Sequence, residues 1–173
     1  MKIGIDISQT AFEKTGTGVF TKNLVEALLK IDKKNEYVLF FSSLRKEMPD
    51  IKINERTVVK KFKIPPSVLS FLWNKLHKFP IERFIGDVDV FITSDWTEPP
   101  VRKAKKASII YDLIIYRHPK ETHEKIIKTQ RMKLKWLKKE DDVIFCISES
   151  TKNDVSEILN IDRKKLKVIY PGL

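Results

Sequence analysis

Two carboxylate side chains follow apolar segments of the chain at the points where those segments give way to polar sequence. Asp95 comes shortly after residues 88–93, and Asp112 comes directly after residues 108–111. A carboxylate in such a position can accept a proton or bind the hydroxyl of a sugar. Capping of the following turn explains a single Asp equally well, so both interpretations stay open at this stage.

Two candidate helix N-termini offer a second kind of site, because backbone N–H groups and the helix dipole favour a negative charge there. The first is a glycine-containing loop that enters a predicted helix, and the second is a run of hydroxyl residues that opens another. The alternatives are a loop that merely turns the chain and ordinary N-capping. The residues concerned are Gly16, Thr17, Gly18, Ser148, Ser150 and Thr151.

Two common nucleotide-binding motifs and several cofactor sites are disfavoured. A dinucleotide fingerprint needs a third glycine where the chain has Thr21, and the segment 36–42 is not followed by an acidic residue that could hold a ribose. No G-x-x-x-x-G-K-[ST] run occurs, which argues against a P-loop. The single cysteine, Cys146, allows neither an internal disulfide nor a multi-cysteine zinc site. We therefore expect neither a metal nor an organic cofactor.

Charge is the unusual feature of the composition. The chain has 34 Lys and Arg residues against 23 Asp and Glu residues, a formal net charge of +11. This excess favours anionic partners such as nucleic acid, a phosphorylated metabolite or a phospholipid surface. No helix-turn-helix, RRM or zinc-finger pattern supports nucleic acid. The opening residues do not resemble a signal peptide, and no segment has the length and apolar character of a membrane span, so we expect a cytoplasmic protein.

One basic segment interleaves lysines with aromatic residues, as does a helix that lies in a membrane interface. An amphipathic cover helix whose lysines extend into solvent explains the same pattern. Under the membrane interpretation, the protein would bind peripherally at the inner face of the membrane. The residues expected to contact an anionic surface are Lys60, Lys61, Lys63, Trp73, Lys75 and Lys78.

Apolar β-branched runs alternate with helical periodicities along the chain. Such alternation is typical of a doubly wound parallel sheet with helices on both faces, and we predict one Rossmann-like α/β domain over residues 1–173. Ligands of such sheets lie at the carboxyl ends of the strands. The predicted strands are 2–7, 36–42, 57–62, 88–93, 108–111, 143–147 and 166–170, and the predicted helices are 19–31, 66–84 with a break at Pro80, 121–139 and 150–159.

Taken in order, these motifs resemble the N-terminal domain of a family-four glycosyltransferase with the two-domain GT-B architecture. The similarity covers essentially the whole chain. The motifs closest to its C-terminal end are the most specific. The similarity is carried by the opening MKIGIDIS, GTGVFT at 16–21, the leucine- and tryptophan-rich segment before DVF at 89–91, YDL at 111–113, ISESTKND at 147–154 and KVIYPG at 167–172.

The resemblance implies a domain that mainly binds the acceptor, a glycan or a lipid-linked molecule. A C-terminal domain would bind the nucleotide-sugar, and the sugar would be transferred with retention of configuration and without a metal. By the same resemblance, Asp112 would be the catalytic residue that faces the reacting sugar. The residues implied to bind the donor or the acceptor are Gly16, Thr17, Gly18, Asp95, Tyr111, Ser148, Ser150 and Thr151.

Two departures from the family pattern matter. Members usually have His-Asp where this chain has Tyr111-Asp112, so no histidine role is carried over to this point. Pro171-Gly172 resembles the linker into the second domain, whose paired-glutamate donor motif the sequence lacks. We therefore expect the chain to need a separate C-terminal domain for activity. The alternatives are a stand-alone membrane- or anion-binding module and a nucleic-acid-binding α/β domain.

Overall fold

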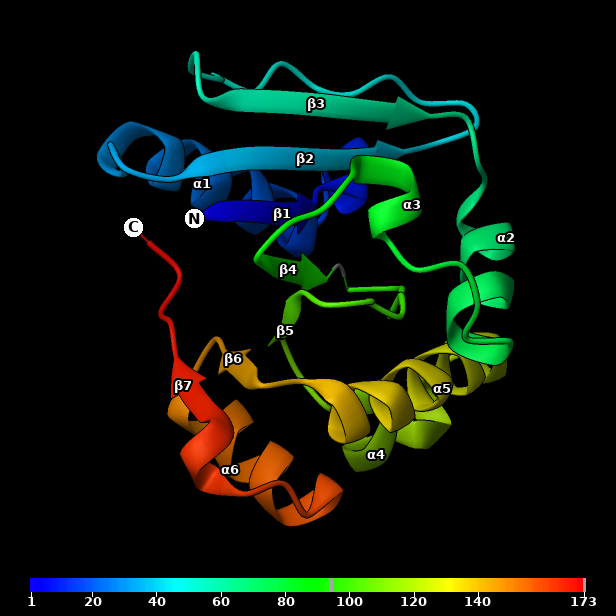
Figure 1. The fold of residues 1–173 in the computed structure, drawn as a ribbon. Coiled ribbons are helices and arrows are strands. Elements are labelled where there is room, and N and C mark those ends of the chain that lie inside the picture. The colour runs from blue at the N-terminus through cyan, green and yellow to red at the C-terminus, as the bar shows by residue number, and fades with distance from the viewer. Residues whose placement is uncertain (94, 173) are drawn as a thin grey trace.

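A computed structural model describes residues 1–93 and 95–172, which form a seven-stranded sheet flanked by helices (Figure 1). All neighbouring strands are parallel, and their order is β3-β2-β1-β4-β5-β6-β7. This order confirms the predicted doubly wound, Rossmann-like class. The strands are β1 (Lys2–Asp6), β2 (Glu36–Ser42), β3 (Thr57–Phe62), β4 (Val90–Thr93), β5 (Lys105–Ile110), β6 (Val143–Cys146) and β7 (Leu166–Val168).

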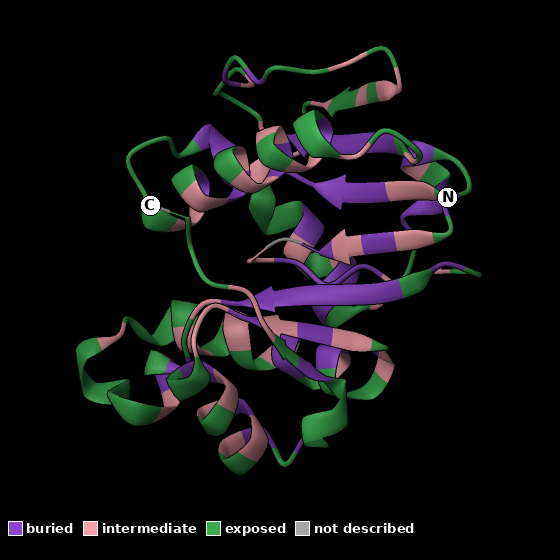
Figure 2. Cartoon of the chain, turned by 90° about the vertical axis from the view of Figure 1, so that its left-hand side faces the viewer, coloured by how far each residue is buried: buried purple, intermediate pink, exposed green. Residues whose placement is uncertain are grey.

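Strand β2 is almost continuously apolar because both of its faces are covered. Leu39 packs in one hydrophobic cluster with Val25 of α1 (Gly16–Ile31), whereas its neighbour Phe40 packs in a second cluster with Trp73. The central strands are accordingly buried beneath helices whose outer surfaces are exposed (Figure 2).

A third cluster fills the space between the last strands and the C-terminal helices. Leu134 and Leu137 of α5 (Glu124–Glu140) pack with Ile144 of β6, together with Val155 of α6 (Glu149–Leu159). The remaining helical elements are short. They are η1 (Ser8–Ala11), α2 (Pro66–Ser70), η2 (Phe71–Lys75), α3 (Glu82–Ile85), α4 (Ile114–Arg117), η3 (Pro119–Glu121) and η4 (Arg163–Lys165).

The strand order reverses between β1 and β4, which pair with each other although β2 and β3 lie between them in sequence. In open parallel sheets, ligands bind outside the carboxyl ends of the strands beside such a switch point. The segments that follow β1, β4 and β5 therefore define the edge of the sheet where a site is expected.

The predicted helical segment over 66–84 is three short elements, α2, η2 and α3, and Pro80 lies in the break before the last of them. The middle element, η2, is a π-helical turn. Trp73 of η2 is fully buried, and its Nε1 donates a hydrogen bond to the carbonyl oxygen of Phe79 at 2.9 Å. Trp73 therefore cannot touch a membrane surface, and its prediction as a surface contact was wrong.

Strand β5 begins three residues before the predicted segment 108–111, at Lys105. Lysines are normally a sign of exposed sequence, yet Lys106 is buried inside the sheet layer. No helix in residues 1–93 and 95–172 combines the length and apolar character that a membrane crossing requires.

Candidate functional site

Three polar side chains from distant parts of the sequence meet at the carboxyl edge of the sheet. Gln9 lies in η1 directly after β1, Thr21 lies in α1, and Tyr111 follows β5. Gln9 Nε2 donates a hydrogen bond to the Tyr111 hydroxyl at 3.0 Å and another to Thr21 Oγ1. The Thr21 and Tyr111 hydroxyl oxygens are 3.1 Å apart. These bonds fix α1 and the end of β5 relative to the switch point.

Tyr111 is held as a neutral phenol. Burial raises its pKa to about 12, the hydrogen bond with Thr21 acts in the opposite direction, and the charge of Asp95 adds to the increase. Its ring packs edge to face against Phe20, with centroids 5.4 Å apart. The Tyr111 hydroxyl can therefore position neighbouring groups through hydrogen bonds, but it is a poor base at neutral pH.

Gly18 is needed because the preceding loop passes close to the first turn of α1. A Cβ atom at this position would lie 2.5 Å from the carbonyl oxygen of Phe12. The Gly18 N–H group donates to Thr15 Oγ1 at 3.2 Å, which is the N-cap bond of the helix. One of the predicted anion contacts is thus used by the cap, while Gly16 and Thr17 lie on the helix surface.

Asp95 follows β4 and is tied into the site through its backbone. Its N–H group donates to Gln9 Oε1 at 2.7 Å, and its carbonyl oxygen accepts from Gln130 Nε2 of α5 at 3.0 Å. Burial raises the pKa of the Asp95 carboxyl, the positive charge of Lys133 opposes this, and the charge of Asp112 adds to it. The Asp95 carboxyl therefore keeps its proton to a higher pH than an ordinary aspartic acid does.

A cavity of about 170 Å³ brings four of the predicted site residues together. Its apolar wall comes from the end of β5, α4 and α5. Its polar groups come from the start of α1, the segment after β4 and the segment after β5. Helix α5 adds the amide of Gln130 and the side chain of Lys133. The four predicted residues are Thr17, Asp95, Tyr111 and Asp112.

Asp112 is exposed at the edge of this cavity. One carboxylate oxygen accepts a hydrogen bond from the N–H group of Ile114 at 3.0 Å, which caps the turn into α4. The capping interpretation and the site interpretation are therefore both compatible with the structure. Because a carboxylate has two oxygens, one can hold the turn while the other faces a ligand.

The hydroxyl residues at the start of α6 serve mainly to cap and anchor that helix. Ser148 Oγ accepts a hydrogen bond from the Thr151 N–H group at 3.0 Å. Thr151 Oγ1 donates to the Tyr111 carbonyl oxygen at 3.1 Å, which connects α6 to the end of β5. Ser150 is exposed, and of the described residues that line the cavity none comes from α6.

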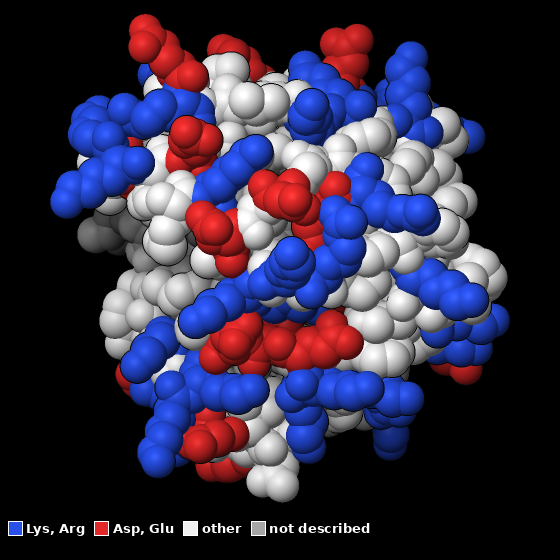
Figure 3. All heavy atoms as spheres, viewed as in Figure 1, with Lys and Arg blue, Asp and Glu red and all other residues white. Residues whose placement is uncertain are grey.

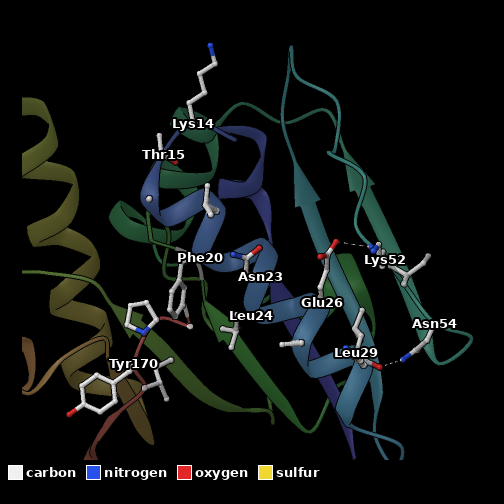
Figure 4. A pocket seen from close by; sticks show the side chains of 18 of the residues that line it. Lys14, Thr15, Phe20, Asn23, Leu24, Glu26, Leu29, Lys52, Asn54 and Tyr170 are labelled. Carbon is white, nitrogen blue, oxygen red and sulfur yellow. Dashed lines mark hydrogen bonds between the residues drawn. The ribbon is translucent and has the colours of Figure 1, made fainter.

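A larger groove of about 1200 Å³ runs along the outer face of α1 (Figure 4). Phe20 and Leu24 line it from the helix, the segment with Tyr170 lines the opposite side, and Gly16 lies at the helix end. The backbone N–H group of Lys52 donates to Glu26 Oε1 at 3.1 Å on its far wall. The two predicted glycine-loop residues on the helix surface therefore belong to different hollows, Gly16 to this groove and Thr17 to the cavity.

The basic segment lies away from the cavity. Lys60 and Lys61 are exposed on the edge strand β3, where charged side chains discourage pairing with another chain. Lys63, Lys75 and Lys78 are also exposed. On the face shown in Figure 3, Lys and Arg side chains are spread widely, with acidic side chains between them.

Gln9, Thr21 and Lys133 were missed as site residues by sequence reasoning. Thr21 was noted as the residue that breaks a dinucleotide fingerprint and as part of the GTGVFT segment, but not as a site residue. Nothing in the local sequence marks Gln9 or Lys133. Within the described part of the chain, no group of three or more His, Cys, Asp and Glu side chains could hold a metal ion.

A comparison with protein families gives a match. The family described as Glycosyltransferase Family 4 matches residues 14–173, which is nearly the whole chain. A search among curated proteins finds no match.

Proposed function

The chain belongs to glycosyltransferase family 4, and we propose that it is the acceptor-binding half of a retaining transferase. Such an enzyme would move a sugar from a nucleotide-sugar to a glycan or a lipid-linked acceptor. The oxygen of the acceptor hydroxyl would form the new bond to the anomeric carbon as the bond from that carbon to the diphosphate oxygen breaks. The hydroxyl proton would pass to this departing diphosphate oxygen, and the nucleoside diphosphate would leave.

The observation that carries the proposal is the cavity that unites Thr17, Asp95, Tyr111 and Asp112 beside the switch point of the sheet. Carboxylates at the mouth of a partly apolar cavity are suited to bind sugar hydroxyls, and the apolar wall suits the faces of a sugar ring. Asp112 would face the reacting hydroxyl, and Asp95 would bind a neighbouring one. Tyr111 would hold the two elements in register.

The donor would be bound mainly by a separate C-terminal domain across the groove that lies on α1. Gly16 and the segment around Tyr170 line this groove, so they would face the donor side. No metal or organic cofactor is required by this proposal. The chain without such a domain would bind acceptors but would not transfer radiolabelled sugar from UDP-[14C]glucose or GDP-[14C]mannose.

A glycan array tests the acceptor role. Fluorescently labelled chain should be retained by a subset of immobilised glycans, and Asp112→Asn should lose at least tenfold of that signal while keeping the cap to Ile114. The matched control is Asp87→Asn, because Asp87 is an exposed carboxylate before β4, at the opposite edge of the sheet. Retention by no glycan, or equal retention of the wild type and Asp112→Asn, would contradict the proposal.

Peripheral membrane binding is a second candidate property, and a specific surface favours it. Four apolar side chains of α2, η2 and the following turn are between 41% and 48% exposed: Val68, Phe71, Leu76 and Phe79. Cations lie over two of their rings, Lys75 above Phe71 and Arg83 above Phe79. Apolar side chains flanked by lysines suit an anionic lipid interface.

Co-sedimentation with vesicles tests this second property. Binding to vesicles that contain phosphatidylglycerol should exceed binding to pure phosphatidylcholine, and Phe71→Ser should weaken it. Lys60→Glu and Lys63→Glu would show whether the contact extends to β3. Steeply salt-dependent binding to DNA or RNA with no vesicle binding would instead favour the nucleic-acid alternative.

A further inference from the structure

Lys133 of α5 is buried, with only 2% of its surface exposed, and it lines the cavity described above. Its Nζ is not one of the side-chain atoms that the described structure buries completely without a hydrogen-bond partner, so the ammonium group opens onto the cavity. An ammonium group has three N–H donors, and an anionic ligand in the cavity could accept hydrogen bonds from them.

Lys106 shows how the same protein treats a buried lysine that has a structural role. Its Nζ lies 2.8 Å from Glu98 Oε1, 3.0 Å from Glu140 Oε2 and 3.9 Å from Asp141 Oδ1. Lys106 is as buried as Lys133, at 1% exposed. The two lysines are therefore buried to the same extent, but they differ in their ion-pair partners.

The charged groups around Lys133 leave room for a ligand. Asp95 and Asp141 both feel its positive charge, but neither carboxylate comes within the 4 Å of an ion pair. Asp112 is the other carboxylate of the cavity and is exposed. Lys133 therefore lies on the inner wall of the cavity, and Asp112 lies at its mouth.

The volume of the cavity and the residues of its other walls indicate what the rest of the ligand is like. The cavity of about 170 Å³ has room for one sugar ring, and Ile110, Ile115 and Leu134 give it an apolar side. An oxyanion placed against Lys133 would gain charge-assisted hydrogen bonds, which are stronger than those of a neutral hydroxyl. Hydroxyl groups at the other end of such a ring would reach the carboxylates nearer the mouth.

We propose that this cavity binds an acidic sugar unit of the acceptor, with its carboxylate or phosphate on Lys133. The proposal rests on the proposed function and narrows its substrate class. Neutral sugars would bind more weakly because they leave the buried ammonium group without a counter-charge. Lys133 would thus be the residue that selects acidic acceptors.

Isothermal titration of the chain tests this with three probes: methyl α-D-glucuronide, glucose 6-phosphate and the neutral methyl α-D-glucoside. We expect at least one acidic probe to bind tenfold or more tightly than the glucoside. Preference for the glucuronide would identify a carboxylate as the oxyanion, and preference for glucose 6-phosphate would identify a phosphate ester. Inorganic phosphate alone should bind weakly, because it lacks the ring.

Lys133→Met should reduce the affinity for the preferred acidic probe at least tenfold and leave that for the glucoside within twofold. Met has a similar volume, and a thermal unfolding curve will verify that the variant is folded. The matched control is Lys135→Met, which removes the same charge from an exposed position on the same helix and should change neither affinity.

The outcomes separate the two proposals. If all three sugar probes bind with equal affinity and Lys133→Met has no effect, the inference is wrong while the acceptor site stands. If no probe binds and the glycan array also shows no retention, both are wrong. Equal losses in Lys133→Met and Lys135→Met would show a general charge effect and would overturn the role of Lys133.

Discussion

Two neighbouring parts of the same sheet face are packed in opposite ways. Over β2, the rings of Phe40, Trp73 and Phe84 lie with centroids 5.6–6.0 Å apart in an apolar cluster. Over β4 and β5, the buried residues include Glu98 and Lys106, whose ion pair is closed at 2.8 Å. The strand registers show why these parts adjoin, since Phe91 pairs with Lys106 across β4 and β5.

The two parts differ in how their stability responds to substitutions. An apolar cluster is stabilised by its buried apolar area and by close packing. Substitutions that remove atoms from it lower the stability in proportion to the number of atoms removed. In a buried charge network, each charged group needs a partner. A group that loses its partner still carries the free-energy cost of its removal from water, so the folded state is destabilised. The charged part borders the candidate site, where no described residue forms an ion pair with Lys133.

The largest expected effect is in the aromatic part. Trp73→Ala removes a fully buried indole and its hydrogen bond to Phe79, and it should lower the free energy of unfolding by about 4 kcal/mol. Urea unfolding measures this. The nearby Phe71 is 48% exposed, so Phe71→Ala should cost less than about 1 kcal/mol. Similar losses in both variants would contradict the assigned packing.

In the charged part, the free energy of unfolding should depend on whether each charge keeps its partner, and much less on the volume of the side chains. Lys106→Met leaves Glu98 buried without its cation, and we expect a loss of about 3 kcal/mol in the free energy of unfolding. Adding Glu98→Gln should restore much of this, since the uncompensated charge is then gone. Lys105→Met, at the exposed neighbouring position, is the control. If Lys106→Met alone were as stable as the wild type, the proposed ion-pair network would be refuted.

The charged part should also make stability depend on pH, through Asp141. Burial and the negative charge of Glu98 raise the pKa of this carboxyl from 3.8 to about 8, against the opposing charge of Lys106. Between these two values the folded chain keeps a proton that the unfolded chain has released. The stability that this group contributes therefore falls as pH rises from about 4 to about 8.

Asp141→Asn isolates this contribution. The free energies of unfolding of the wild type and the variant should diverge between about pH 5 and about pH 8, and the variant should lose less stability over that window. Parallel curves over the whole range would show that Asp141 is ionised in the folded chain.

The smallest stability effect is expected at Lys133. Removing the Lys133 ammonium group breaks no ion pair between described residues. Lys133→Met should therefore change the free energy of unfolding by no more than about 1 kcal/mol in either direction. A loss as large as that of Lys106→Met would show that Lys133 is a structural counter-ion. Urea unfolding of the two variants side by side decides between these roles.

The sheet could be predicted because its signal is local. Apolar runs such as residues 36–42 and 143–147 mark buried parallel strands without any knowledge of their neighbours. The start of β5 could not be found in this way. Lys106 can be buried because Glu98 and Glu140 lie next to it in space, and Glu140 is 34 residues further along the chain.

The site was predictable in part for the same reason. Asp95, Tyr111 and Asp112 follow strands, so strand ends alone bring them to one edge. Gln9 depends on a hydrogen bond to Tyr111, which lies 102 residues away, and no short window contains both. The error at Trp73 has a similar origin, since an aromatic residue among lysines fits an interface until its ring partners are known.

The central claim is that the cavity at the ends of β4 and β5 binds the acceptor and not the donor. The most direct measurement is a pair of ¹H–¹⁵N correlation titrations of the chain, one with methyl α-D-glucuronide or methyl α-D-glucoside and one with UDP. We expect a glycoside to shift the amide resonances of Thr17, Tyr111 and Asp112, and UDP to leave them unchanged. Shifts of these resonances by UDP, with no response to either glycoside, would contradict the account.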